Sequence, residues 1–184
     1  MKRLLGLLAA AAMPALGAHA YEQAYAPTVP GAFEIKALPA VRAMKAEREG
    51  PYFGTENGLF RRLFRYIQAN DVAMTTPVEA ETQTAVMRFF AGPDAPADLP
   101  STNGVSVEAL GERVVASAGA RGSYSEENIA ETTRELRAWL GTQAGWVEAG
   151  PPRAAYWNGP FIPGFFKKYE VHIPVRPASP AGPK

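Results

Sequence analysis

Residues 58–82 read GLFRRLFRYIQANDVAMTTPVEAET, and this stretch decides the fold. Apolar residues in its first part recur every three or four positions, which predicts a helix over Thr55–Asn70. Strand-like sequence follows at Val72–Thr82 and Thr84–Ala91, and it also precedes the helix, where apolar and charged residues alternate within Phe33–Glu49. The first half of the chain is therefore predicted to be a β-α-β-β unit.

The second half of the chain repeats this order of elements. A loop rich in Pro, Gly and Asp, residues 92–104, separates the halves. After it, Val105–Ser123 is strand-like, Ser125–Gly141 is helical, and Trp146–Asn158 and Phe165–Val175 are strand-like again. A stacked array needs about three repeats or more. Two units instead predict one duplicated α+β domain, with an antiparallel sheet that curls toward a barrel and two helices against it.

The two predicted helices carry apolar faces of different width. A helix that packs on one neighbour needs an apolar stripe of about 100°. The first helix has a face that covers nearly half of its circumference, which predicts that something besides the sheet touches it. The second has a narrower stripe and Ser125 as its N-cap, and it is predicted to be structural. The wide face comprises Leu59, Phe60, Leu63, Phe64, Tyr66 and Ile67, and the narrow one Ile129, Thr133, Leu136 and Leu140, with Trp139 at its edge.

The first 20 residues have the pattern of a secretory signal peptide. Lys2 and Arg3 precede the apolar run Leu4–Met13, and Ala18-His19-Ala20 matches a cleavage site. The run is shorter than the roughly 20 residues that span a bilayer as a helix. We therefore predict cleavage after Ala20, a periplasmic or secreted protein, and no transmembrane segment after cleavage. The alternative is an uncleaved membrane anchor.

The chain divides into four predicted segments. The signal peptide covers residues 1–20, and an extended N-terminal segment with two prolines covers residues 21–32. A single folded domain covers residues 33–175. A flexible tail with three prolines, residues 176–184, ends the chain.

Composition excludes several classes of function. The chain has no cysteine, which excludes disulfide scaffolds, thiolate nucleophiles and iron–sulfur clusters. The signal peptide holds two of the 19 basic residues, so 17 remain against 18 acidic ones, and no excess of positive charge predicts nucleic-acid binding. Of two histidines only His172 remains, which excludes a multi-histidine metal site. Phosphate-binding loops, the G-x-S-x-G nucleophile elbow and H-E-x-x-H are also absent.

Four stretches of the chain are distinctive. The most specific are A-M-T-T-P-V within Val72–Val78 and a Pro-Phe-x-Pro segment within Tyr156–Val171 that leads through a basic pair to Glu-Val. The others are FEIK at residues 33–36 and GLFRRLFRYI at residues 58–67. Together they resemble the SOUL haem-binding protein family over nearly the whole mature chain. Where the family usually has Asn before that Glu-Val, this chain has Tyr169.

The resemblance covers Phe33–Val175 and implies duplicated β-α-β-β units that form a distorted antiparallel β-barrel flanked by two helices. It also implies that haem or another tetrapyrrole binds an apolar surface near the first helix. Haem is a flat, mostly apolar disc with two carboxylates. Burying roughly 300–400 Å² of it is worth about 8–10 kcal/mol, before association costs of at least about 4 kcal/mol. A rim ion pair adds only about 0–1 kcal/mol, so apolar contact is expected to set the affinity and basic residues to orient the disc.

Candidate haem-binding residues lie on and beside the first helix. The apolar candidates can alternatively belong to the protein core. Arg62 and Arg65 are candidates for propionate contact, unless they belong to a solvated stripe of the helix. Lys167 and Lys168, in the family's basic pair, are candidates for binding a haem carboxylate from the side opposite the helix. The apolar candidates are Leu59, Leu63, Tyr66, Ile67 and Met74.

The iron ligand is the least defined part of the predicted site. His172 alternates with Val171 and Ile173, so it is predicted to point away from the apolar side, as a surface residue. Met74 or a tyrosine can ligate iron, but Met74 is expected to pack in a strand. Weak or absent ligation by the protein is therefore expected, with haem held mainly by its faces.

Three functions are compared on this basis. The leading hypothesis is an exported, non-enzymatic binder of haem or a related tetrapyrrole, used for carriage, buffering or sequestration. The second is a binding or interaction module for another hydrophobic small molecule or a protein partner. The third, an enzyme that acts on a tetrapyrrole or an ester, is disfavoured by the scarcity of His and Cys.

Overall fold

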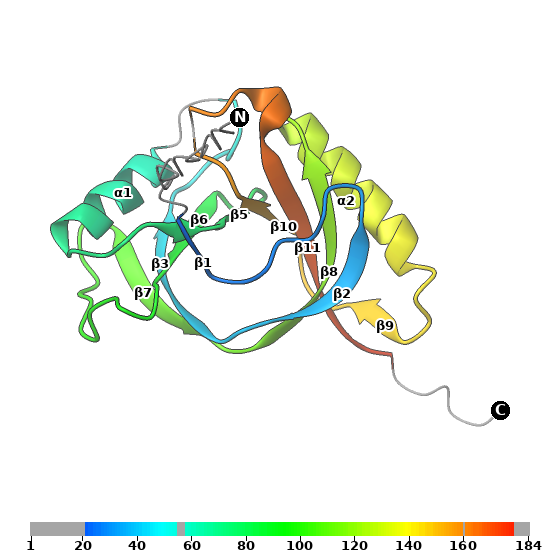
Figure 1. Cartoon of the computed structure of the whole chain (residues 1–184), viewed down its shortest axis with the longest axis horizontal. Coiled ribbons are helices and arrows are strands. Elements are labelled where there is room, and N and C mark those ends of the chain that lie inside the picture. Colours follow the sequence, from blue (N-terminus) through cyan, green and yellow to red (C-terminus); the bar gives the residue numbers. More distant parts are fainter. Residues whose placement is uncertain (1–20, 55–57, 160, 179–184) are drawn as a thin grey trace, which may run out of the picture.

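The computed structural model describes residues 21–54, 58–159 and 161–178 (Figure 1). Nine strands form one large sheet, and two helices lie against it. The predicted α+β class is confirmed. The elements are β1 (Glu22–Gln23), β2 (Phe33–Leu38), β3 (Val41–Glu47), α1 (Leu59–Ala69), β4 (Thr75–Thr76), β5 (Val78–Glu81), β6 (Val86–Phe90), β7 (Val105–Leu110), β8 (Arg113–Arg121), α2 (Glu126–Leu140), β9 (Trp146–Glu148), β10 (Arg153–Tyr156), the 3₁₀ turn η1 (Gly164–Phe166) and β11 (Lys168–Pro177).

The order of strands in the sheet confirms the predicted duplication. The sheet runs β2-β8-β11-β10-β5-β6-β3-β7, and β9 pairs with β11 beside this path. From the centre outward, the first half therefore contributes β5, β6 and β3, and the second half contributes β10, β11 and β8 in the equivalent places. The halves meet where β5 pairs antiparallel with β10, with Tyr156 opposite Val78.

A continuous antiparallel ribbon ties the two halves together. Strands β2 and β3 pair with β8 and β7 in one register, from Phe33 opposite Ala118 to Ala46 opposite Val105. The ladder is interrupted only at residues 39–40 and 111–112, where Pro39 lacks the N–H that a continued ladder needs. As a result, the first strand of each half pairs with a strand of the other half.

The sheet does not close, so the predicted β-barrel is wrong in this respect. Within the described residues, β2 and β7 form the two ends of the strand order and do not pair with each other. The physical reason is the bend in the ribbon. On one side of the bend, β8 pairs with the next strand of the sheet, β11, and β2 is the edge strand. On the other side, β3 pairs with the next strand, β6, and β7 is the edge strand. The result is a curled sheet whose two edges lie at opposite ends of the ribbon.

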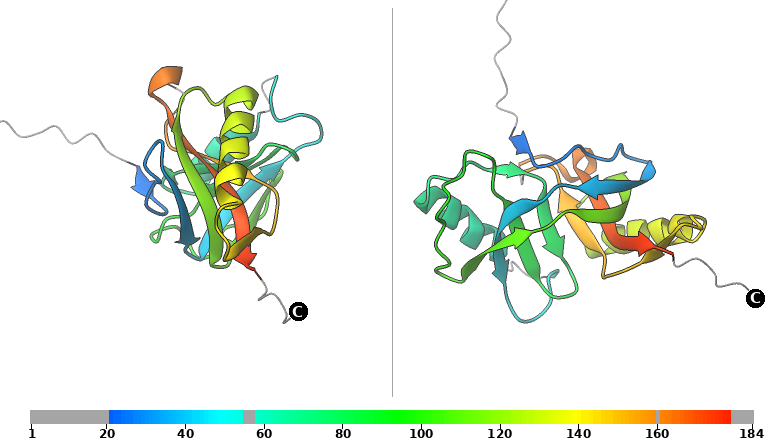
Figure 2. Two further views of the ribbon diagram at one scale, coloured as in Figure 1. Left: turned by 90° about the vertical axis from the view of Figure 1, so that its right-hand side faces the viewer. Right: turned by 90° about the horizontal axis from the view of Figure 1, so that it is seen from below.

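Both predicted helices are present. Helix α1 begins at Leu59 after Gly58, whose positive φ of 71° suits glycine. Helix α2 begins after Ser125, whose side chain accepts a hydrogen bond from the Asn128 backbone N–H at 3.3 Å, as an N-cap does. From the side, α2 lies across β8 and β11 (Figure 2).

The two faces of the sheet differ in polarity. The face toward the helices carries the hydrophobic core, whose fully buried members include Met44, Leu59, Leu63, Leu136 and Ile173. The opposite face, called here the helix-free face, holds buried charged and polar side chains, among them Glu79, Arg88 and Glu170. The segment after β1 runs along this face, and its Thr28 backbone N–H donates to the buried Glu170 carboxylate at 2.8 Å.

The predicted signal peptide and most of the predicted tail lie outside the described residues. In the part of the chain that the structure describes, neither helix has the length and apolarity needed to cross a membrane.

Candidate functional site

An aromatic pocket lies over the centre of the sheet, where the two halves meet. Its volume is about 190 Å³. Residues of β5, β6 and β10 form its floor, α1 contributes one wall, and residues 124, 158 and 167 contribute the other. The lining residues are Tyr52, Phe60, Val78, Met87, Tyr124, Tyr156, Asn158 and Lys167.

Hydrogen bonds and ring contacts fix the second wall of the pocket. The Tyr124 hydroxyl accepts a hydrogen bond from the Asn158 backbone N–H at 2.8 Å and donates to the Lys168 carbonyl at 3.0 Å. The Tyr124 ring stacks on Tyr156 with 4.2 Å between centroids. Lys167 Nζ lies 4.7 Å from the centroid of the Tyr124 ring, within cation–π range. The wall is therefore a rigid aromatic stack with one cation over it.

The tyrosines of the pocket are neutral at physiological pH. Burial raises the pKa of Tyr124 and of Tyr52 to about 12 each. Burial, followed by the charge of Tyr52, also raises the pKa of Tyr156. Because phenolates are disfavoured here, Lys167 is the charged residue among those that line the pocket. The pocket suits an apolar, planar guest that carries negative charge at its edge.

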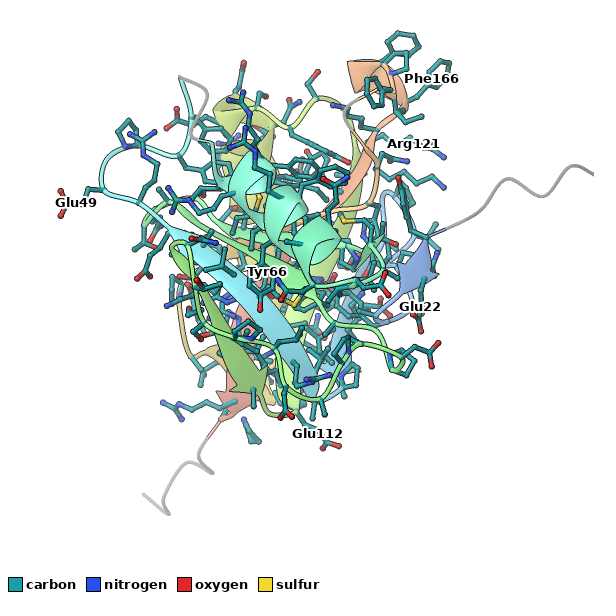
Figure 3. All side chains as sticks on the ribbon, turned by 90° about the vertical axis from the view of Figure 1, so that its left-hand side faces the viewer. Glu22, Glu49, Tyr66, Glu112, Arg121 and Phe166 are labelled. Carbon is teal, nitrogen blue, oxygen red and sulfur yellow. The ribbon has the colours of Figure 1, made fainter. Side chains whose placement is uncertain are left out.

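Large apolar side chains are exposed on both sides of the pocket, and we call them the aromatic rim. Phe64 of α1 is 39% exposed, and its ring stacks on the pocket residue Phe60 with an interplanar angle of 11°. On the other side, the segment that leads into η1 exposes further rings, and Phe166 projects beyond the end of the sheet (Figure 3). The rim comprises Phe64, Phe161, Ile162, Phe165 and Phe166.

The apolar residues predicted on α1 lie mainly in the core. Leu59 and Leu63 are fully buried and Ile67 nearly so, all within the cluster between helix and sheet. Tyr66 is also buried, and its hydroxyl donates to the Pro100 carbonyl at 2.8 Å. Met74 is half-buried and packs against the same cluster. The wide apolar face thus divides into a core part and an outer part, Phe60 and Phe64.

The predicted basic residues lie in different places. Arg62 and Arg65 line an outer α1 pocket of about 530 Å³, together with Tyr66. Arg62 Nη1 donates to the Glu47 carbonyl at 3.1 Å. Lys167 lies at the aromatic pocket, whereas Lys168 is exposed at the start of β11. The structure therefore brings Arg62, Arg65 and Tyr66 together but separates them from Lys167.

His172 is buried, so its prediction as a surface residue is wrong. It does lie on the face opposite Val171 and Ile173, but that face is enclosed, and the side chain is 1% exposed. His172 Nε2 lies 2.6 Å from Glu170 Oε2. Glu170 and Glu79, both fully buried, were not predicted from the sequence as functional residues. The alternation of Glu170 and His172 with apolar residues was the available signal, but it is typical of a solvated strand face as well.

Comparison with models of protein families identifies the family of this chain. A family model described as SOUL heme-binding protein matches residues 20–174. The chain belongs to the SOUL heme-binding protein family. The predicted resemblance is thereby confirmed, and it covers most of the chain.

Solved structures show the same fold as this SOUL protein at low sequence identity. EcmrR in its complex with DNA has a TM-score of 0.63 and 14% identity, over 78% of this chain and 57% of that chain. The EcmrR C-terminal domain has a TM-score of 0.57 and 13% identity, over 79% of this chain and 97% of that one. A hydrolase from Listeria innocua has a TM-score of 0.55 and 16% identity, over 83% and 94%. The search of curated proteins found no match.

The residues of this SOUL protein fit the faces and the charge of haem better than they fit its iron. Stacked rings and exposed apolar side chains offer flat contact, and Lys167 offers a cation for a propionate. His172 lies on the helix-free face and is engaged with Glu170. The raised pKa values of Tyr52 and Tyr124 oppose the phenolate form in which tyrosine ligates iron. Among the described residues, no group of three His, Cys, Asp or Glu side chains is placed to hold a metal ion.

Proposed function

We propose that this SOUL protein is an exported, non-enzymatic binder of haem or a related tetrapyrrole, which serves carriage, buffering or sequestration. The observation that supports this most is the aromatic rim beside an aromatic pocket whose one charged lining residue is Lys167. Phe161 is 97% exposed, Phe165 70% and Phe166 59%. The Phe165 and Phe166 rings also lie in contact, with 4.2 Å between centroids. Large exposed apolar side chains that gather in this way are typical of a binding surface. The predicted signal peptide supports export.

The size of the pocket determines how a tetrapyrrole would lie. Pockets that enclose ligands have volumes of about 300–1,000 Å³, whereas the aromatic pocket measures about 190 Å³. One edge of the disc would therefore enter between Phe60 and Tyr124. The rest of one face would lie against Phe64 and the η1 segment, which would cover apolar surface on both partners. Chemistry that haem supplies when bound, such as redox change at its iron, would proceed without a histidine ligand from this chain.

The geometry also ranks the basic residues. Lys167 lies at the pocket itself. Arg65 follows Phe64 by about 100° around the helix, and Arg62 lies about 160° away from Phe64, at the side where it donates to Glu47. We therefore assign propionate contact to Lys167 first and Arg65 second. Lys168 and Arg62 are the less favourable candidates.

Titration of the mature protein, residues 21–184, with hemin tests the proposal. A saturable Soret shift with quenching of tryptophan fluorescence is expected at micromolar hemin. Phe165→Ser removes about 60–100 Å² of apolar contact, worth about 2 kcal/mol, and is expected to weaken binding roughly tenfold to thirtyfold. Val29→Ser is the matched control, because Val29 is 69% exposed on a distant segment. Absence of a saturable shift in the wild-type protein overturns the proposal.

The volume of the pocket also favours a second candidate, a smaller planar hydrophobic ligand. Such a ligand would fit wholly within about 190 Å³ and would not need the rim. It predicts a different pattern of variants: Tyr124→Leu would weaken binding, whereas Phe165→Ser would not. A ligand that co-purifies and lacks the porphyrin spectrum would support this candidate over haem.

A further inference from the structure

The helix-free face of the sheet carries a buried ionic cluster on the side opposite the aromatic pocket. Side chains alternate along each strand, so β11 sends Tyr169, Val171 and Ile173 to the core and Glu170 and His172 to this face. Neighbouring strands contribute opposite charges. The cluster comprises Lys36, Glu79, Arg88, Arg113, Arg153, Glu170 and His172.

Both buried carboxylates already have their partners. Glu170 accepts from Lys36 Nζ at 2.7 Å and from the Thr28 backbone N–H at 2.8 Å, besides the contact with His172. Glu79 accepts from Arg113 Nη1 at 3.0 Å and from Arg153 Nη1 at 3.1 Å. These contacts occupy Arg113 Nη1 and Arg153 Nη1, and Arg153 Nη2 also pairs with Glu81 Oε1 at 3.2 Å, so Arg113 Nε, Arg113 Nη2 and Arg153 Nε are left for further acceptors.

A cavity of about 280 Å³ lies beside these groups. We call it the arginine–histidine cavity. One wall is charged, formed by Glu79, Arg113, Arg153 and His172, and the other is apolar. The Arg113 and Arg153 side chains of the charged wall are 21% and 22% exposed. The remaining lining residues are Leu38, Val115, Ala149, Gly150, Pro151 and Pro174.

Several polar atoms of this wall are buried without a partner in the described chain. They are Arg113 Nε, Arg113 Nη2, Arg153 Nε and His172 Nδ1. His172 itself is 1% exposed, and its other ring nitrogen is held by Glu170. A buried donor without an acceptor costs about 1–3 kcal/mol, and more when it is charged. The three arginine nitrogens are donors that an acceptor in the cavity would satisfy, whereas Nδ1 of a neutral His172 that donates from Nε2 to Glu170 is itself an acceptor.

The charge of the wall sets the charge of that acceptor. The cavity lining carries two arginines and one glutamate, and Glu81 pairs with Arg153 from outside the lining. With Glu79 and Glu81 already bound, the remaining guanidinium donors suit one carboxylate, and the wall has no excess of positive charge for a dianion. The apolar wall of Leu38, Val115 and the two prolines suits a short hydrocarbon chain, and guanidinium groups bind carboxylates through paired hydrogen bonds. We propose that the arginine–histidine cavity binds a short-chain monocarboxylate, with its carboxylate on Arg113 and Arg153 and its tail against the apolar wall.

Nuclear magnetic resonance of the arginine side chains tests this directly. The mature protein is titrated with sodium butyrate at constant ionic strength, and the Nε–Hε signals are followed in ¹H–¹⁵N spectra. Saturable shifts are expected for Arg113 and Arg153. The signal of Arg134, which pairs with Glu131 on the exposed side of α2, is the control and is expected to stay in place. Sodium chloride and inorganic phosphate serve as competing anions.

Two variants separate the charge of the wall from the space of the cavity. Arg113→Lys keeps a cation beside Glu79 but removes the paired donors, and it is expected to weaken butyrate binding roughly tenfold. Ala149→Leu leaves all charges in place and reduces the volume of the cavity, and it is also expected to weaken butyrate binding. Ala149 is exposed, so this variant keeps the core intact.

The outcomes distinguish the alternatives. Shifts that rise linearly with butyrate, or that chloride reproduces, would mean that only water and diffuse ions meet the wall, and they would overturn the proposal. Tighter binding of phosphate than of butyrate would overturn the monocarboxylate class. Hemin binding on the other face is measured separately, so failure of one proposal leaves the other standing.

Discussion

Glu170 makes the stability of this SOUL protein depend on acid pH. Burial alone would raise the pKa of this carboxyl group, but hydrogen bonds and charges from His172 and Lys36 outweigh burial and lower the pKa from 4.5 to about 2. The unfolded chain therefore takes up a proton near pH 4.5, and the folded chain does so only near pH 2. A carboxyl group with a lowered pKa stabilises the fold above the unfolded value, and this stabilisation is lost as pH falls through that interval.

The size of the effect follows from the interval between the two pKa values. At about 1.4 kcal/mol per pH unit, the fall from 4.5 to about 2 corresponds to about 3 kcal/mol. We predict that Glu170→Gln lowers the free energy of unfolding near neutral pH by about this amount. The amide keeps the shape of the side chain, but it offers no charge to Lys36 Nζ at 2.7 Å or to His172 Nε2 at 2.6 Å.

Urea unfolding, followed by tryptophan fluorescence at a series of pH values, measures both parts of the prediction. The wild-type protein is expected to lose stability below about pH 4.5, and Glu170→Gln is expected to show a flatter profile. Glu34→Gln is the control, because its side chain is 46% exposed and 3.7 Å from the same lysine. It is expected to cost less than about 1 kcal/mol. Equal stability of wild type and Glu170→Gln near neutral pH, or parallel pH profiles, would refute this reasoning.

Three further substitutions test the packing and the proposed site. Ser125→Ala removes the N-cap of α2 and is expected to cost about 1 kcal/mol of stability in urea unfolding. Leu63→Ala opens a cavity in the core and is expected to cost about 3 kcal/mol, while the hemin affinity of the folded fraction stays the same; a large loss of affinity would mean that Leu63 touches the ligand. Lys167→Ala is expected to weaken hemin binding by about threefold at low salt and less at high salt, and an unchanged affinity at low salt would remove Lys167 from the site.

Most elements of the fold follow from local sequence patterns. The apolar period of residues 59–67 predicts α1, and Ser125 with the following acidic residues predicts the start of α2. The order of elements predicts the duplication, and the structure places both halves in equivalent positions of the sheet. These features depend on contacts within about one helical turn or one strand, and the composition and spacing of residues in the sequence predict such contacts.

Closure of the sheet and burial of its charges depend on contacts between distant residues. Strand alternation places Glu170 and His172 on one face, but it does not say whether that face meets water. Lys36 and Thr28 lie more than 130 residues from Glu170 in sequence and enclose it. In the same way, the spacing on α1 does not say that Leu63 meets the sheet while Phe64 meets solvent, because that depends on how the helix is rotated on the strands.

The ribbon that crosses from one half to the other has a consequence for the integrity of the chain. Each half completes the sheet of the other half, so neither half has a complete sheet of its own. After a single cut in the connecting stretch 92–104, the two pieces would still be joined by all the backbone hydrogen bonds between β2–β3 and β7–β8. Such a nicked molecule is expected to keep its form, and pieces made separately are expected to reassemble by complementation. The covalent link between the halves is thus less important to the architecture than their mutual exchange of strands.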